Sequence, residues 1–368
     1  MKLENQNILI TSNEPWSDVW FSKHNYAWEL SKKNKVYFIN SPGKWKLRNL
    51  FSNAIETTAI TETLSVISIQ NIFPSNLNAL KELNNFIISK RLKAYMNNRG
   101  LQDWMLWSFT PLFLFRPYLL QCKFTVFHIM DMNWTNFYGA KLLSQFADRL
   151  ILVSEHILPE YKFCTKQKLV IGHGISEEEF FLEDSKLSLV KKEMEGYEDF
   201  GLYVGVIDKR CDFPLIKKMA EAMSSTTFVF VGPLNIPGDH PYINLFNGKT
   251  KNIVSLGKRP YKELKYYISL SKFCVSPMDL SYSGNELSHH KTFTYLAQGK
   301  PVFGPPFKAY HEIDELLYTG NSHDVIIQKI VEFQNKGEAE TLKTKRINYI
   351  KQFLYSSHLS KIEQFFNS

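Results

Sequence analysis

Cysteine is scarce in this chain, with 4 residues among 368. The four stand far apart, and none forms a CxxC or Cys/His ligand pair, so the sequence indicates neither a zinc site nor a disulfide framework. The first ten residues, MKLENQNILI, lack the long apolar run of a secretory leader. We therefore expect a cytoplasmic protein with reduced thiols at Cys122, Cys164, Cys211 and Cys274.

Long hydrophobic runs are also missing. The most apolar segment, residues 104–120, is interrupted by Pro111, Arg116 and Pro117 and is short for a membrane span. Hydrophobic residues make up 44% and charged residues 22%, which is ordinary globular usage and argues against a disordered or collagen-like chain. Lys and Arg number 44 against 36 Asp and Glu, and the net charge of +8 favours anionic partners: nucleotides, nucleic acid or an acidic membrane.

Several common nucleotide-binding motifs are absent as well. No GxGxxG opens the first predicted helix, no GxxxxGK(S/T) occurs, and no RNP or zinc-finger pattern is present. These absences weaken the dehydrogenase, P-loop and nucleic-acid hypotheses, and nucleic acid becomes the least favoured anionic partner.

Short apolar runs recur along the chain and alternate with helical stretches. Because the runs are continuous, they predict parallel sheets that are covered on both faces. A charged segment between residues 176 and 200 divides them into two series. The runs are residues 7–11, 35–40, 64–69, 104–107, 124–130, 149–154 and 168–174, then 200–207, 227–233, 252–257, 272–278 and 300–306.

A chain of this length favours two domains. We expect an α/β protein with two doubly wound Rossmann-like domains, at residues 1–178 and 179–347. The amphipathic tail, about residues 348–368, is predicted to be helical and to pack back on the first domain. Open α/β sheets bind ligands beyond the carboxyl ends of their strands, so functional residues are expected on loops facing a central cleft between the domains.

The most informative segment is SGNELSHHKTFTYLAQGKP, residues 283–301. It lies between two predicted strands and indicates a loop followed by a helix that starts near Ser288. Ser288 is a good N-cap, and the free amides and dipole of that helix end would suit a diphosphate, with Lys291 adding positive charge. An ordinary capped helix is the alternative interpretation.

Residues 285–302, NELSHHKTFTYLAQGKPV, resemble the donor-site motif of bacterial GT-B glycosyltransferases, in which a sugar-contacting glutamate precedes a helix reading roughly K-x-x-E-Y-L-A-x-G-K-P-V. The branch it resembles includes teichuronic-acid and exopolysaccharide enzymes, of the family-four-like or glucuronosyltransferase-like type. Further segments resemble the same family in the same order: PWSDVWFSKHNYAWELSKKNKVYFINSP, FHIMDMNW, ADRLILVSEHI, VIGHGISEEEFF, YVGVIDKRCDFPLI, FVFVGP and NIVSLGKRPYKELKYYISLSKFCVSPM.

The resemblance implies the GT-B fold and metal-independent hexosyl transfer from a nucleotide sugar, expected to be UDP-linked, to a polysaccharide or lipid-linked glycan. No cofactor is implied, because the nucleotide sugar is a substrate. Many relatives carry two glutamates separated by seven residues, one for the sugar and one for the ribose. Glu286 stands at the first position, but the second holds Thr294, whose hydroxyl cannot accept a bidentate ribose contact. Retention and inversion both stay open.

Basic side chains are expected to bind the donor diphosphate, because charge develops there as the nucleotide departs. Lys209 and Arg210 follow the strand at 200–207 and resemble the basic residues of that loop in relatives, and Arg259 follows the strand at 252–257. The adjacent His289 and His290 do not share a helix face, which favours donor binding over a metal site. The predicted donor-binding set is Gly205, Lys209, Arg210, Arg259, Glu286, Ser288, His289, His290, Lys291, Thr294 and, in a Gly-His-Gly turn, His173.

Two residues are predicted to be catalytic. Asp131 ends the strand at 124–130, where relatives place an aspartate, and its carboxylate can deprotonate an acceptor hydroxyl. The alternative is that Asp131 caps the following helix. His24 is the second candidate base, although lone histidines are commonly structural.

Aromatic residues are abundant at 14%, and those on loops after strands, Trp16, Trp20 and Trp134, are predicted to form an acceptor platform. Residues 44–51, KWKLRNLF, suit peripheral contact with an anionic membrane or a simple exposed basic helix. Two alternatives to the transferase remain: a nucleotide-sugar 2-epimerase of the same fold and a non-catalytic, degenerate glycosyltransferase subunit. The donor sugar, acceptor, linkage and oligomeric state stay open.

Overall fold

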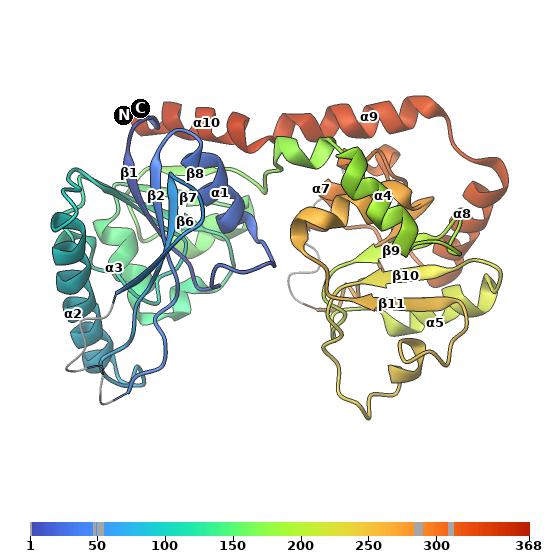
Figure 1. Ribbon diagram of the computed structural model, residues 1–368, viewed down its shortest axis with the longest axis horizontal. Coiled ribbons are helices and arrows are strands. Elements are labelled where there is room, and N and C mark those ends of the chain that lie inside the picture. Colours follow the sequence, from blue (N-terminus) through green and yellow to red (C-terminus); the bar gives the residue numbers. More distant parts are fainter. Residues whose placement is uncertain (1, 47–48, 50–54, 283–289, 308–312) are drawn as a thin grey trace. The chain divides into compact units, whose positions relative to one another are not determined.

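The computed structural model describes residues 2–46, 49, 55–282, 290–307 and 313–368, in two domains (Figure 1). The first domain comprises Met1–His173 and Tyr355–Ser368, and the second comprises Gly174–Leu354. Each domain is described by itself. Both boundaries lie a few residues from the positions 178 and 347 expected from the sequence.

The first domain is built on an eight-stranded sheet with the order β3-β4-β2-β1-β5-β6-β7-β8. Every neighbouring pair is parallel except β3 and β4. The strands are β1 (Asn7–Thr11), β2 (Lys35–Ile39), β3 (Glu56–Ala59), β4 (Leu64–Ser68), β5 (Met105–Ser108), β6 (Phe124–Ile129), β7 (Arg149–Leu152) and β8 (Lys168–Val170), and the α-helices are α1 (Ser22–Ser31), α2 (Asn78–Asn97), α3 (Tyr138–Phe146) and α10 (Tyr355–Asn367).

Strand β1 illustrates why continuous apolar runs form this sheet. Its side chains alternate between the two faces, and both faces are covered. Ile8 and Ile10 pack in one core with Tyr26 of α1 and with α10, whereas Leu9 packs in a second core that includes α2. Strand β3, by contrast, is exposed along its whole length and carries no hydrophobic pattern that would have revealed it.

The second domain has a six-stranded, wholly parallel sheet with the order β11-β10-β9-β12-β13-β14. The predicted α/β class with two parallel-sheet domains is therefore confirmed. The strands are β9 (Gly201–Val204), β10 (Phe228–Val231), β11 (Ile253–Gly257), β12 (Phe273–Val275), β13 (Val302–Gly304) and β14 (Tyr318–Thr319), and the α-helices are α4 (Asp184–Glu193), α5 (Phe213–Ala222), α6 (Leu264–Leu270), α7 (His290–Ala297), α8 (His323–Lys336) and α9 (Glu340–Ile350).

The C-terminal tail forms two helices that belong to different domains. Helix α9 stays with the second domain, where the fully buried Arg346 pairs with Glu338 and donates to the carbonyl oxygens of Leu316 and Gly299. Helix α10 packs in the first domain, and its Tyr355 ring lies 4.8 Å from the ring of Tyr26. The tail predicted to be helical at about residues 348–368 thus includes the end of α9 and all of α10, and α10 belongs to the first domain.

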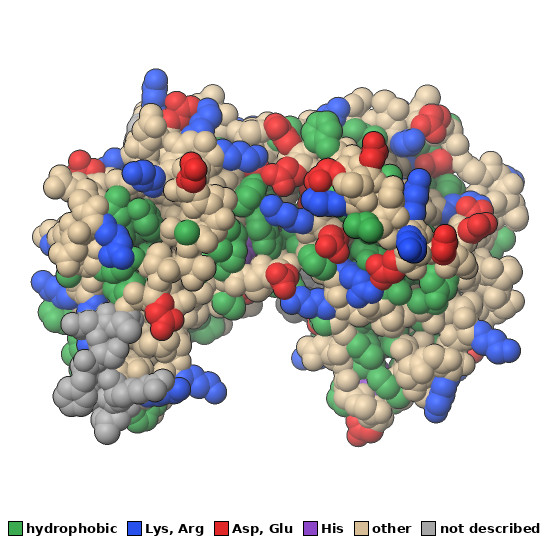
Figure 2. All heavy atoms as spheres, viewed as in Figure 1, with side chains coloured by type: hydrophobic (Ala, Val, Ile, Leu, Met, Phe, Trp, Pro, Cys, Tyr) green, Lys and Arg blue, Asp and Glu red, His purple; other side chains and the backbone are tan. Residues whose placement is uncertain are grey.

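Charged and hydrophobic side chains both reach the surface of each domain on the face shown in Figure 2. Within the described residues, no helix combines the length and the apolar character needed to cross a bilayer.

Candidate functional site

The carboxyl end of β9 holds the strongest cluster of predicted donor-binding residues. The backbone there is fixed to α7, because the amide of Val204 donates to the hydroxyl of Tyr295 at 2.7 Å. Gly205 follows with a φ of +142°, a conformation that L residues with side chains rarely adopt. A Cβ at Gly205 would also lie 3.1 Å from the Tyr203 hydroxyl oxygen, so the glycine leaves room beside that hydroxyl.

Lys291, in the first turn of α7, brings positive charge to this point. Its Nζ donates to the Tyr203 hydroxyl at 3.1 Å and to Met278 Sδ at 3.1 Å, and it lies 4.4 Å from the centre of the Tyr203 ring. Tyr203 in turn donates to the carbonyl of Val206. Burial lowers the pKa of Lys291 to about 8, because the charged ammonium is partly removed from water. The ammonium is therefore held in place beside Gly205.

The loop after β9 carries the next two predicted residues. Arg210 forms an ion pair with Asp208, with Nη2–Oδ2 at 2.8 Å. Lys209 Nζ lies 5.9 Å from the centre of the Tyr282 ring. Asp208 and Arg210 both lie within electrostatic range of Lys291, since each contributes to the pKa of that lysine. The structure thus brings Gly205, Arg210 and Lys291 together.

Arg259 is placed differently from the prediction. Its guanidinium donates to Glu193 Oε1 at 2.5 Å, to the Tyr267 hydroxyl at 3.1 Å and to the carbonyl of Leu256 at 2.6 Å. These contacts tie α4 to α6 and to the end of β11. The geometry favours a structural role for Arg259 over the predicted phosphate contact.

Three predicted donor-binding residues, Glu286, Ser288 and His289, lie outside the described residues, as does the side chain of His290. Thr294 lies three residues after Lys291 on α7 and is 4% exposed. Its contact with a ribose stays a prediction.

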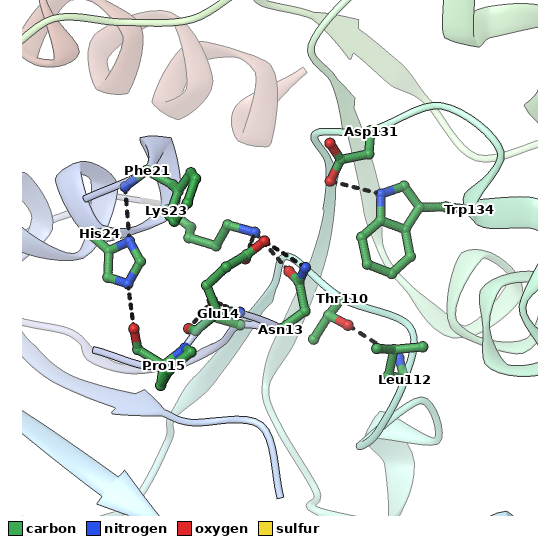
Figure 3. Close-up of polar contacts among 11 residues, drawn as sticks. Asn13, Glu14, Pro15, Phe21, Lys23, His24, Thr110, Leu112, Asp131 and Trp134 are labelled. Atoms are coloured by element: carbon green, nitrogen blue, oxygen red, sulfur yellow. Dashed lines mark hydrogen bonds and ion pairs between the residues drawn. The ribbon is translucent and has the colours of Figure 1, made fainter. Parts of the chain in front are cut away.

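In the first domain, Asp131 follows β6 and is exposed. Its Oδ2 accepts a hydrogen bond from Trp134 Nε1 at 3.2 Å, which orients the carboxylate (Figure 3). Asp131 does not cap the next α-helix, because α3 begins only at Tyr138 and its N-cap position is held by Phe137. The structure therefore leaves the carboxylate available at the carboxyl edge of the sheet.

His24 occupies a position that argues against the predicted base. The amide of Phe21 donates to Nδ1 at 3.0 Å, and Nε2 lies 3.1 Å from the carbonyl oxygen of Pro15, to which it donates (Figure 3). Both ring nitrogens are thus used in holding the loop between β1 and α1. The side chain is fully buried, and burial lowers its pKa to about 4. A positioning role for a neutral imidazole fits these contacts better than proton transfer.

A polar cluster in the same loop was missed in the sequence. Lys23 is 4% exposed, pairs with Glu14 and donates to Asn13 Oδ1 at 2.6 Å. In Figure 3, Asn13 and Glu14 extend from the loop after β1, Lys23 extends from α1, and Asp131 extends from the loop after β6. The sequence does show a turn-like segment, SNEPW, followed by the start of a helix. Nothing in that pattern indicates that Glu14 pairs with Lys23.

His173 is also held in the first domain, with Nδ1 2.9 Å from Ser22 Oγ. Burial lowers its pKa to about 4, and the nearby charge of Asp131 partly opposes that shift. Asp131 and His173 therefore lie within electrostatic range of each other. The predicted contact of His173 with the donor stays a prediction.

The predicted aromatic platform is only partly exposed. Trp134 is buried, whereas Trp16 and Trp20 are half-buried, with ring centres 5.2 Å apart, and pack on His24. Of the basic segment 44–51, residues 47, 48, 50 and 51 lie outside the described residues. Among the residues that are described, no group of three or more His, Cys, Asp or Glu side chains could hold a metal ion.

Comparisons with known proteins define the fold. Sucrose-phosphate synthase from Thermosynechococcus elongatus superimposes with a TM-score of 0.69 at 14% identity, over 99% of this chain and 98% of the other. Anabaena HepE, solved in complex with UDP and glucose, superimposes with a TM-score of 0.68 at 14% identity, over 99% of this chain and 100% of the other. A glycosyltransferase from Rickettsia africae gives 0.66 at 14% identity over 98% of each chain. The chain has the GT-B fold, which confirms the expected architecture.

One curated relative is similar in sequence. A segment of 112 residues is 31% identical to the teichuronic acid biosynthesis glycosyltransferase TuaH of Bacillus subtilis, over 30% of this chain and 28% of the relative. The match thus spans little more than a quarter of that protein's length. No protein-family model matches the chain.

Proposed function

We propose that the protein is a glycosyltransferase that moves a sugar from a nucleotide-sugar donor, UDP-linked, to a glycan acceptor in cell-surface polysaccharide synthesis. One observation carries the proposal: within a GT-B fold, the Lys291 ammonium is held over the Tyr203 ring beside Gly205, at the carboxyl end of β9. HepE was solved with UDP and glucose, and TuaH is named for teichuronic acid synthesis, which supports the donor and acceptor classes.

In this proposal, the second domain binds the donor diphosphate. Lys291 and the loop that carries Lys209 and Arg210 would stabilise the negative charge that develops as the nucleoside diphosphate departs, in place of a metal ion. Because the pKa of Lys291 is about 8, its ammonium form still predominates at neutral pH. A bound diphosphate would favour that charged form further.

The first domain would activate the acceptor. Asp131 is exposed and is oriented by Trp134, so its carboxylate can take the proton of an acceptor hydroxyl as that oxygen bonds to the anomeric carbon. The bond between that carbon and the diphosphate oxygen breaks in the same step. We place the reaction in the cytoplasm, on an acceptor that is a polysaccharide or a lipid-linked glycan.

The test is calorimetric titration of the purified protein with UDP, GDP, CMP and dTDP sugars, followed by product analysis with and without glycan acceptors. We expect preferential binding of UDP sugars and transfer only when an acceptor is present. Conversion of the donor without an acceptor would instead identify a nucleotide-sugar 2-epimerase. Binding without turnover on any acceptor would favour a non-catalytic subunit, and no binding of any nucleotide would overturn the proposal.

A further inference from the structure

The first domain exposes several aromatic and aliphatic side chains on three elements, α2, the 3-10 turn η2 (Pro117–Leu119) and α3. Helix α2 exposes Leu83 and Phe86, η2 exposes Tyr118, and helix α3 exposes Tyr138 and Phe146. The exposed fractions are 47% for Phe86, 50% for Tyr118 and 42% for Phe146. Large apolar side chains gathered in this way commonly mark an interaction surface. We call these five residues the α2–α3 patch.

Printed contacts connect the elements of the α2–α3 patch. Turn η2 packs against both α2 and α3. The ring of Tyr118 lies 5.0 Å from that of Phe146, in an edge-to-face arrangement. Arg116, just before η2, pairs with Glu82 of α2, and the Tyr138 hydroxyl donates to the same carboxylate at 2.6 Å. The three elements that carry the patch are therefore in contact with one another.

The two helices of the patch carry more basic than acidic residues. Helices α2 and α3 carry one acidic residue, Glu82, and that carboxylate is already engaged by Arg116 and Tyr138. Two lysines lie over aromatic rings: Lys90 Nζ is 5.6 Å from the ring centre of Phe86, and Lys141 Nζ is 5.9 Å from that of Phe163. The basic residues of the two helices are Lys81, Lys90, Arg91, Lys93 and Lys141.

We propose that the α2–α3 patch binds the surface of a membrane that contains anionic lipids. Aromatic rings settle at the headgroup level, and lysines beside them pair with anionic headgroups while their alkyl stems cover apolar area. A second copy of this chain fits the patch less well. A two-fold interface would place each basic surface against its own copy, where like charges repel.

This surface differs from the segment at residues 44–51 that the sequence suggested for membrane contact. Asp131 of the candidate acceptor site lies on the connection between β6 and α3, which leads into Tyr138 of the patch. The consequence for a lipid-linked acceptor rests on the proposed function. Membrane binding itself does not, and it is measured without any sugar substrate.

The test is co-sedimentation of the full chain with vesicles of phosphatidylcholine alone and of phosphatidylcholine mixed with phosphatidylglycerol. We expect binding to the mixed vesicles that weakens with added salt. The variant Lys90→Glu/Lys141→Glu should partition roughly tenfold more weakly, since each basic residue near an anionic surface adds to the attraction. Phe86→Ser/Phe146→Ser should also weaken binding, through loss of apolar insertion.

Matched controls lie on the second domain. Lys249→Glu/Lys251→Glu makes the same change in net charge at exposed positions, and Phe181→Ser/Leu189→Ser removes two side chains that are each 70% exposed. Both controls should bind mixed vesicles like the wild type. The proposal would be overturned if patch and control variants bound vesicles equally, or if the wild type did not bind them. It would also be overturned if the wild type formed a dimer that the patch substitutions, but not the control substitutions, dissociated. Titration of each variant with UDP sugars tests the proposed function separately, so failure of membrane binding and failure of donor binding can be told apart.

Discussion

The two domains hold their candidate functional side chains in different ways. In the second domain, Lys291 lies on a helix that Tyr295 fixes to the central strand β9, and its ammonium contacts side chains of the core. In the first domain, Asp131 and Glu14 lie on loops, and each is oriented by a neighbour in sequence or across one loop. The candidate donor-binding lysine is thus held against the core and partly desolvated, whereas the candidate acceptor-side carboxylates lie on loops and are more exposed.

This difference has an energetic consequence. A charge fixed against the core acts at full strength on a ligand, because little reorganisation is needed when the ligand binds. Side chains on loops can accommodate acceptors of varied shape, and loops tolerate substitution with little loss of stability. Substitutions in the two domains should therefore have separable effects on turnover, donor affinity and folding stability.

The largest effect is expected from Asp131→Asn. An amide cannot accept the acceptor proton, so turnover should fall roughly 10³-fold if general base catalysis is lost, while the affinity for the donor stays unchanged. Turnover is measured with the donor identified in the nucleotide panel. Asp239→Asn, at an exposed position of the second domain, is the matched control and should behave like the wild type. Equal activity of both variants would exclude Asp131 as the base.

A smaller effect on turnover, but a large one on binding, is expected from Lys291→Met. Methionine keeps the length of the side chain beside Tyr203 and removes the charge, so we expect donor affinity to fall about 100-fold, as for loss of one preorganised electrostatic contact. Folding stability should not fall, because a partly desolvated cation is removed. Titration calorimetry and urea unfolding measure the two quantities. Lys251→Met, which is exposed in the same domain, should change neither. Unaltered donor affinity in Lys291→Met would remove the residue from the site.

Lowering the pH should change the folding stability of the two domains in opposite directions. Burial lowers the pKa of His24 from 6.5 to about 4. As the pH falls from 6.5 towards 4, the imidazole is protonated in the unfolded chain but not in the folded one, so the first domain loses stability over this range. For His24 alone, this loss amounts to about 3 kcal/mol. Burial raises the pKa of Glu179, in the second domain, from 4.5 to about 7. Its contribution to the stability of that domain is therefore present below pH 4.5 and is lost as the pH rises through 7.

Fluorescence can report on the first domain alone, because all 7 tryptophans lie within residues 1–173. Urea unfolding followed by tryptophan emission should show lower stability at pH 5 than at pH 7. Hydrogen exchange of peptides from the second domain should show no such loss, and Glu179→Gln should remove the opposite dependence there. A parallel fall in both domains would contradict the opposing roles of His24 and Glu179.

The sequence predicted the strands well and the pairing of polar side chains poorly. Strands such as β1 and β9 are buried on both faces, and this leaves a continuous apolar run that is visible without any tertiary information. The break in the tail at Leu354 was missed, because no proline or glycine separates the two helices, which pack in different domains.

The candidate site was predicted where a residue follows a strand and missed where its partner is distant in sequence. Asp131 was chosen as a candidate for its place at the end of a strand, and Lys291 for its place at the start of a helix. His24 was assigned a catalytic role because nothing in the sequence reveals that Pro15 and Phe21 occupy both of its ring nitrogens. Arg259 was assigned to phosphate because its partner Glu193 lies 66 positions away, beyond any local pattern.

The smallest effect on the donor is expected from Arg259→Ala, which tests whether Arg259 has a structural role or binds phosphate. Loss of the guanidinium leaves Glu193 and Tyr267 without a charged partner, so the free energy of unfolding should fall by about 1–2 kcal/mol. Donor affinity should stay within about twofold of the wild type, since the ion pair lies outside the Lys291 cluster. Glu193→Ala and the double variant complete the cycle, and the two single losses should be non-additive because they remove one shared ion pair. A drop in donor affinity seen in Arg259→Ala but not in Glu193→Ala would restore Arg259 to the diphosphate.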